Sequence, residues 1–208
     1  MRRTLRSTLL LLIVAAAGWL LLTSVAPGAW VASWAPCQRN WAWTPAWQPR
    51  VSPLAALPIG FSRGHGKLCY GQPSLRGRTM IGGAAVPYGK LWRTGANEPT
   101  TLHLDLPARL GDLALLPGSY SIYTIPGRER WQVIVNRATR QWGIESEYTA
   151  TVERQEVGRF DVPAERLDHP VETLTFRAEP AATDAYDLVL EWQTTRIRLP
   201  IAAGLDGS

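Results

Sequence analysis

The stretch Thr101-Leu102-His103-Leu104-Asp105-Leu106 carries a leucine at every second position. Because successive side chains of a β-strand point to opposite faces, this pattern predicts a strand with one buried face. The same period of two recurs in four later segments: residues 131–136, 172–176, 186–192 and 196–199. The C-terminal part of the chain is therefore expected to consist of half-buried strands.

Turn-forming residues separate these segments. Pro117-Gly118 and Pro126-Gly127 suit type II turns, because proline presets a negative φ and glycine accepts the positive φ that follows. Segments of about six residues at spacings of about ten, without a long period of 3.6, are typical of an all-β domain. We expect an antiparallel β-sandwich or a partly open barrel. We expect one helical turn over residues Pro163 to Leu167.

The composition fits one folded domain with additional segments. Of the 208 residues, 46% are hydrophobic and 19% are charged, which excludes a disordered or collagen-like chain. The expected organisation is a leader over residues 1–26, a Trp- and Pro-rich stalk or linker over 27–60, the β-domain over 61–202 and a disordered tail over 203–208.

The charges are distributed unevenly along the chain. Residues 1–97 hold 11 of the 22 basic residues and no acidic residue, whereas residues 98–208 hold all 17 acidic residues. Such a division indicates either an anionic partner or basic and acidic segments that meet in the fold. The sequence contains no Lys/Arg run and no zinc-finger spacing, so no nucleic-acid partner is expected.

The N-terminus has the pattern of an export element. Arg2, Arg3 and Arg6 precede an uncharged stretch, Ser7 to Gln38, whose apolar centre is Leu9 to Leu22. We expect an uncleaved anchor helix in the cell inner membrane, with the domain in the periplasm by the positive-inside preference. The alternative is a cleaved signal peptide and a secreted or periplasmic protein.

Five of the ten tryptophans gather in the stalk: Trp30, Trp34, Trp41, Trp43 and Trp47. Prolines among them prevent a long helix. Because tryptophan favours the membrane–water boundary, these rings either lie on the outer face of the membrane or cover an exposed flank of the domain.

The chain has two cysteines, Cys37 and Cys69, and three scattered histidines. In an oxidising compartment a Cys37–Cys69 bond is permitted, and free thiols are the alternative. No Cys or His pair has metal-ligand spacing, so neither a metal site nor a cofactor is expected.

The stretch from Tyr70 to Thr101 does not alternate and is rich in glycine, which predicts a long ordered loop. Its most specific part is Val86-Pro87-Tyr88-Gly89-Lys90-Leu91-Trp92-Arg93-Thr94-Gly95-Ala96-Asn97-Glu98. Long loops on a rigid sheet either carry function or close one end of the sheet.

Together with residues 116–121, 125–127, 136 and 141–143, this loop resembles the bacterial family known as domain of unknown function 2911. The resemblance continues through residues 171–174 and 190–196, and so extends over about residues 65–201. It implies a small exported β-rich domain and no established activity. Cys69 and Gln72 stand where the family pattern leads us to expect an acidic residue and an arginine.

The loop supports three functional hypotheses. In the first, it binds an anionic or glycan ligand, because arginine offers a planar fork to carboxylate or phosphate and aromatic rings offer a face to a sugar. The candidate ligand-binding residues are Arg76, Arg78, Tyr88, Trp92, Arg93, Asn97 and Glu98.

In the second hypothesis the loop is an internal brace of a structural or interaction domain. Arg93 and the carboxylates of Glu98 and of Glu191 or Glu172 would then form partly buried ion pairs. Trp92, Trp142 and Trp192 would belong to the core. In the third, Glu98 is the acid or base of a hydrolase. A single carboxylate whose pKa is open to adjustment does not make a catalytic mechanism without a defined partner group. No catalytic residue is therefore assigned, and a non-enzymatic role is expected.

Overall fold

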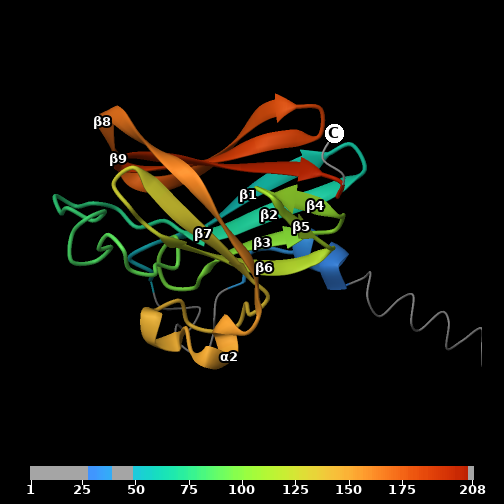
Figure 1. Cartoon of the computed structure of the whole chain (residues 1–208), viewed down its shortest axis with the longest axis horizontal. Coiled ribbons are helices and arrows are strands. Elements are labelled where there is room, and N and C mark those ends of the chain that lie inside the picture. Colours follow the sequence, from blue (N-terminus) through green and yellow to red (C-terminus); the bar gives the residue numbers. More distant parts are fainter. Residues whose placement is uncertain (1–27, 39–48, 206–208) are drawn as a thin grey trace, which may run out of the picture.

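The computed structural model describes residues 28–38 and 49–205 (Figure 1). Its strands are β1 Leu54–Phe61, β2 Gly64–Gly71, β3 Thr100–Leu104, β4 Ala108–Leu110, β5 Leu113–Leu115, β6 Gly118–Ile125, β7 Arg130–Asn136, β8 Glu156–Ala182 and β9 Ala185–Ala203. Residues 28–34 are helical, and two short helices, η1 Glu145–Glu147 and α2 Ala150–Glu153, lie between β7 and β8.

All nine strands belong to one antiparallel sheet with the order β1-β2-β3-β6-β7-β8-β9-β4-β5. The sheet is not closed, and β1 and β5 are its edges. The prediction of an all-β antiparallel fold is thus confirmed. The Tyr70–Thr101 stretch is the predicted loop, apart from its ends in β2 and β3 and isolated bridges.

Strand β8 connects the two halves of the sheet. Its first part, up to Pro163, pairs with β7, and from Ala164 onward it pairs with β9. The predicted helical turn over residues 163–167 is wrong, because these residues lie in β8 where the strand changes partner. Ala164 donates its backbone N–H to Glu129 O at 2.8 Å. Within a helical turn this N–H would bond to a residue three or four positions earlier, and Glu129 is far more distant in sequence.

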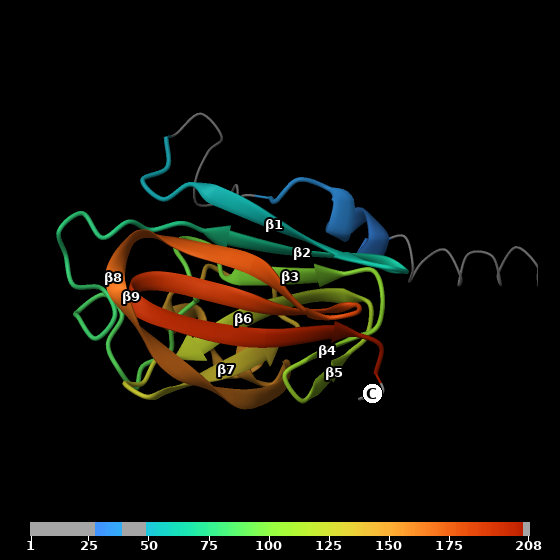
Figure 2. The same cartoon turned by 90° about the horizontal axis from the view of Figure 1, so that it is seen from above.

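Viewed from above, β8 and β9 lie over strands of the other half of the sheet (Figure 2). Side chains from both halves form one hydrophobic core. Leu102 and Leu104 of β3 are fully buried in it, as their alternation predicts. From the other half, β9 contributes Leu188, Leu190 and Trp192. Because both halves supply the core, neither half buries its apolar face without the other.

The N-terminal expectations fall partly outside the described residues. The predicted anchor helix and stalk residues Trp41, Trp43 and Trp47 lie there, as does the end of the predicted tail. Among residues 28–38 and 49–205, no helix is long and apolar enough to cross a membrane. Strand β1 lies largely within the range expected to be stalk, and it forms a hairpin with β2.

Candidate functional site

Three polar residues form a row across the face of the sheet that points away from the core. In the strand register, His103 of β3 lies opposite Lys67 of β2 on one side and Ser119 of β6 on the other. Alternation sends these side chains outward because their neighbours Leu68 and Leu102 point into the core. The pairing of β2, β3 and β6 thus places an amine, an imidazole and a hydroxyl side by side.

Residues 28–38, here called the N-terminal cover, pack on β2 beside this row. The ammonium group of Lys67 donates to the backbone oxygens of Ala32, at 2.6 Å, and Ala35. A disulfide joins Cys37 of the cover to Cys69 of β2. The bond that the sequence left open is therefore formed, and it fixes the cover to the sheet.

Residues 137–155, here called the second cover, pack on the same face over β6 and β7. Asn136 Nδ2 donates to Val152 O at 2.7 Å, and Ser121 Oγ donates to Ala138 O at 2.7 Å. Gln141 Nε2 donates to the hydroxyl of Tyr123 at 2.9 Å. Burial raises the pKa of Tyr123 to about 12, so this hydroxyl stays neutral and accepts the bond.

A cavity of about 580 Å³, here called the outer-face cavity, lies between the two covers and the sheet. Its volume is that of a site for a small organic molecule. Its lining combines backbone and small residues with polar side chains: Lys67, Glu98, Thr101, His103, Ser119, Thr139, Arg140 and Gln141.

Lys67 is a poorly hydrated cation of this cavity. Burial lowers the pKa of Lys67, whose ammonium group has three N–H donors. Ala32 and Ala35 accept two of them, which leaves one for a ligand within the described part of the chain. A negatively charged ligand atom here would compensate the desolvation of the ammonium group.

The imidazole of His103 is neutral at physiological pH. Burial, assisted by the charge of Lys67, lowers its pKa to about 4. Its Nδ1 lies 2.7 Å from Ser119 Oγ, a distance typical of a nucleophile and its base. An imidazole with so low a pKa is a weak base, and general-base catalysis works best when the pKa is near the operating pH. The pair is thus better suited to binding a ligand than to activating a nucleophile.

Glu98 lines the outer-face cavity and forms an ion pair with Arg50. Arg50 Nη1 donates to one carboxylate oxygen at 3.2 Å, and Nη2 donates to the other. The side chain of Arg50 is 3% exposed. Glu98 is the only one of the seven predicted ligand-binding residues that lines this cavity.

Two other candidates are structural parts of the loop. Trp92 is buried and stacks on Trp192, so it offers no face to a ligand. Arg93 is half-buried, and its guanidinium group donates to Asn97 O at 2.9 Å. Burial lowers the pKa of Arg93, which the negative charge of Glu145 partly opposes.

The remaining candidates each make local contacts of their own. Arg76 and Arg78 are exposed, and Arg78 bonds to backbone oxygens of its own turn, Ser74 and Leu75. Tyr88 is exposed at 37%, with the guanidinium carbon of Arg128 4.9 Å from its ring centroid. Asn97 Nδ2 donates to Ser52 O. The structure does not bring the seven predicted residues together into one site.

The loop is attached to the sheet by contacts other than the predicted ion pairs. The backbone N–H groups of Met80 and Ile81 donate to Gln193 Oε1 at 2.8 and 3.2 Å. Glu172 accepts the backbone N–H of Arg76 at 2.8 Å. Glu98 pairs with Arg50 instead of Arg93, and Glu191 pairs with residues of β8 and β9.

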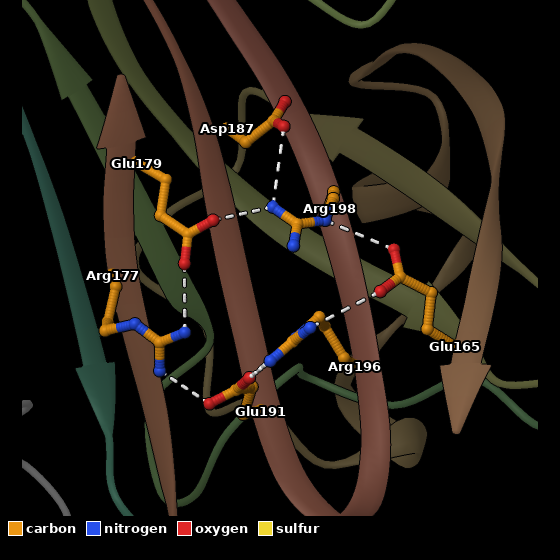
Figure 3. Close-up of polar contacts among 7 residues, drawn as sticks. All are labelled: Glu165, Arg177, Glu179, Asp187, Glu191, Arg196 and Arg198. Atoms are coloured by element: carbon orange, nitrogen blue, oxygen red, sulfur yellow. Dashed lines mark hydrogen bonds and ion pairs between the residues drawn. The ribbon is translucent and has the colours of Figure 1, made fainter. Parts of the chain in front are cut away.

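These pairs of Glu191 belong to a ladder of charges on β8 and β9 (Figure 3). Glu191 accepts hydrogen bonds from Arg177 Nη1 at 2.5 Å and Arg196 Nε at 2.6 Å. The bond from Arg177, helped by Arg196, holds the pKa of Glu191 below its usual range although burial opposes the shift. Alternating acids and bases continue the ladder: Glu165, Arg177, Glu179, Asp187, Glu191, Arg196 and Arg198. With its charges paired internally, the ladder is a structural feature of this half of the sheet.

Sequence reasoning missed Lys67, His103 and Ser119. His103 stands in the segment that predicted the first strand, where its outward position was readable from the alternating leucines. Its pairing with Lys67 and Ser119 depends on the strand register, which the sequence does not state. Among the described residues, no group of three or more His, Cys, Asp or Glu side chains is placed to hold a metal ion.

The comparison with protein families bears directly on this chain. The family model described as protein of unknown function (DUF2911) matches residues 52–201. The chain belongs to the DUF2911 family. The matched part of this DUF2911 protein includes β1, which the resemblance had left out. Neither the curated proteins nor the solved structures gave a match to this chain.

Proposed function

We propose that this protein is a cell-envelope domain that binds a small anionic ligand in the outer-face cavity. The observation that carries the proposal is the row Lys67–His103–Ser119, which opens into a cavity of about 580 Å³. Lys67 would supply the charge complement of a carboxylate, phosphate or sulfate, and Ser119 a hydroxyl within reach of the ligand.

The proposal places the protein in the cell inner membrane as a single-pass protein with its domain in the periplasm. The uncharged stretch Ser7–Gln38 behind three arginines supports an anchor. The Cys37–Cys69 disulfide supports an oxidising compartment, because such bonds persist mainly outside the cytosol. Cleavage of the leader, which would yield a soluble periplasmic or secreted protein, is the alternative arrangement.

Binding is tested on the full chain in nanodiscs by thermal shift against carboxylates, phosphates, sulfates, neutral sugars and acidic sugars. We expect an anion to raise the melting temperature of the wild type, and Lys67→Met and Ser119→Ala to lose that increase. Arg76→Ala/Arg78→Ala is the matched control, since it removes the exposed arginines of the loop and leaves the cavity intact. Loss of binding in this control alone would move the site to the loop, and no response to any anion would contradict the proposal.

A bound anion favours the charged form of Lys67, so the proposal also predicts a pH dependence. Because the pKa of Lys67 is already lowered by burial, affinity should fall as the pH rises through that lowered pKa. Titrations of the best anion over alkaline pH measure this effect, and an affinity independent of pH would exclude Lys67 as the binding cation.

A second candidate role, a structural or interaction domain with the loop as an internal brace, is favoured by the burial of Trp92. It accounts for the loop but not for the outer-face cavity. A Glu-dependent hydrolase has less support, because Arg50 occupies both carboxylate oxygens of Glu98.

A further inference from the structure

Exposed aromatic side chains gather at one end of the N-terminal cover. Trp30, Val31 and Trp34 are 57%, 52% and 56% exposed. They are three of the seven large hydrophobic residues that lie exposed in the described part of the chain. The ring centroids of Trp30 and Trp34 are 6.4 Å apart, and those of Trp34 and His65 are 4.0 Å apart.

These rings belong to a surface that also carries a cation. A shallow depression of about 390 Å³ is lined by Trp30, Trp34, Phe61, Arg63, His65 and Asp105, among others. Asp105 is engaged within the protein, since it accepts hydrogen bonds from the backbone N–H of His65 at 2.5 Å and from Ser33 Oγ at 3.2 Å. We call Trp30, Val31, Trp34, Arg63 and His65 the aromatic surface.

The domain holds the aromatic surface in a fixed position. Ser33 Oγ donates to Trp30 O at 2.8 Å and also contacts Asp105. The bonds from Lys67 and the disulfide at Cys37 attach the same cover to β2. The cover therefore holds the two indole rings in place with more than half of each side chain exposed. Burial of aromatic rings of this size would be favourable, and the domain itself does not provide it.

The position of the surface along the chain indicates what covers it. The apolar stretch that begins at Leu9 runs to Ala26, only four residues before Trp30. Tryptophan rings prefer the headgroup level of a bilayer, and a basic side chain beside them is attracted to anionic lipid phosphates. A membrane anchored through Leu9–Ala26 would thus reach the aromatic surface without any linker.

We propose that the aromatic surface docks on the phospholipid bilayer, with Trp30 and Trp34 in the headgroup layer and Arg63 at lipid phosphates. This inference rests on the membrane anchor of the proposed function and goes beyond it. The domain lies against the membrane in one orientation instead of moving freely on a stalk.

The test uses the full chain in nanodiscs of phosphatidylethanolamine and phosphatidylglycerol, with and without lipids brominated near the headgroup. Bromine quenches nearby tryptophan fluorescence. The contribution of Trp30 and Trp34 is obtained by subtracting the Trp30→Phe/Trp34→Phe variant from the wild type. Trp142→Phe, a half-buried tryptophan of the second cover, is the matched control.

We expect the fluorescence contributed by Trp30 and Trp34 to be quenched and that of Trp142 to be unaffected. Arg63→Glu should reduce this quenching, and near-ultraviolet circular dichroism checks that the variants are folded. Unquenched Trp30 and Trp34 in a chain that stays in the nanodisc would overturn the docking and leave the anchor standing. A chain that does not enter nanodiscs at all would overturn the anchor, and the docking with it.

Discussion

The indole rings of Trp92 and Trp192 stack with their centroids 5.8 Å apart and their planes inclined by 15°. Trp92 comes from the glycine-rich loop and Trp192 from β9, so the loop reaches across the core. The Trp92 Nε1–H donates to Gly95 O at 3.1 Å, which satisfies its only polar atom. The loop is therefore part of the hydrophobic core and not a separate appendage.

Replacing Trp92 by alanine is expected to lower the free energy of unfolding by about 3–5 kcal/mol, the usual effect of removing a buried aromatic side chain. Tyr88→Ala, at an exposed position of the same loop, should change it by less than about 1 kcal/mol. Urea denaturation of both variants measures the difference. Equal effects would mean that Trp92 is not held in the core.

The glycine-rich loop lies in close contact with Gly71 at the end of β2. A Cβ atom added at Gly71 would lie 2.0 Å from the backbone oxygen of Ala96, which a backbone atom cannot relieve by rotating. Gly71→Ala should destabilise the domain by at least about 2 kcal/mol. Gly60→Ala is the matched strand control, because a Cβ there meets nothing within 4 Å. A tolerated Gly71→Ala would show that the loop is not seated on β2.

Glu191 is the buried member of the charge ladder, with a side chain 8% exposed between Arg177 at 44% and Arg196 at 28%. Because both guanidinium groups remain hydrated, Glu191→Gln is expected to cost about 1–2 kcal/mol, less than a fully buried pair. Glu165→Gln, on the more exposed part of the ladder, should cost less than about 1 kcal/mol. Thermal unfolding at neutral pH compares the two, and a larger loss in Glu165→Gln would contradict this ranking.

The half-buried strands were predictable because the chain alternates where one face of the sheet meets the core, as at Leu102 and Leu104. Strand β1 was missed because its residues include Pro58 and Gly60 and do not alternate clearly. The helical turn expected after Pro163 was wrong because a proline starts a helix locally, whereas pairing with β7 and β9 decides the conformation there.

The candidate site was less predictable than the fold. Lys67, His103 and Ser119 are ordinary polar residues in the sequence, and only the register of β2, β3 and β6 places them side by side. Conversely, Trp92 and Arg93 lie in a conspicuous loop motif but serve its packing. A glycine-rich motif that fits a loop against a core is not distinguishable by composition from one that binds a ligand.

Acidification tests the environment of His103. Its folded-state pKa of about 4 lies below the ordinary value of 6.5, so the unfolded chain binds the proton more tightly. The resulting stability is fully present above pH 6.5 and is lost as the pH falls from about 6.5 to about 4, by up to about 3 kcal/mol. Denaturant unfolding across this range measures it. In His103→Gln the slope should be shallower, and an unchanged slope would assign the acid sensitivity to other groups.

Reduction of the Cys37–Cys69 bond should loosen the N-terminal cover. The bond closes a loop with a sequence separation of 32, for which the chain-entropy model gives a loss of about 4 kcal/mol on opening. Hydrogen exchange with and without a dithiol should show faster exchange in residues 28–38 and no change in residues 137–155. Uniformly faster exchange would indicate global destabilisation instead, and Cys37→Ser/Cys69→Ser should reproduce the reduced state without reductant.

Strand β8 runs without interruption through both halves of the sheet. A chain divided at Ala164 would leave each fragment with half of a shared strand. Neither fragment of such a split protein should therefore fold on its own. A circular permutant opened at the Thr183–Asp184 turn keeps β8 whole. Chimaeras of related domains therefore need their crossover points outside this strand.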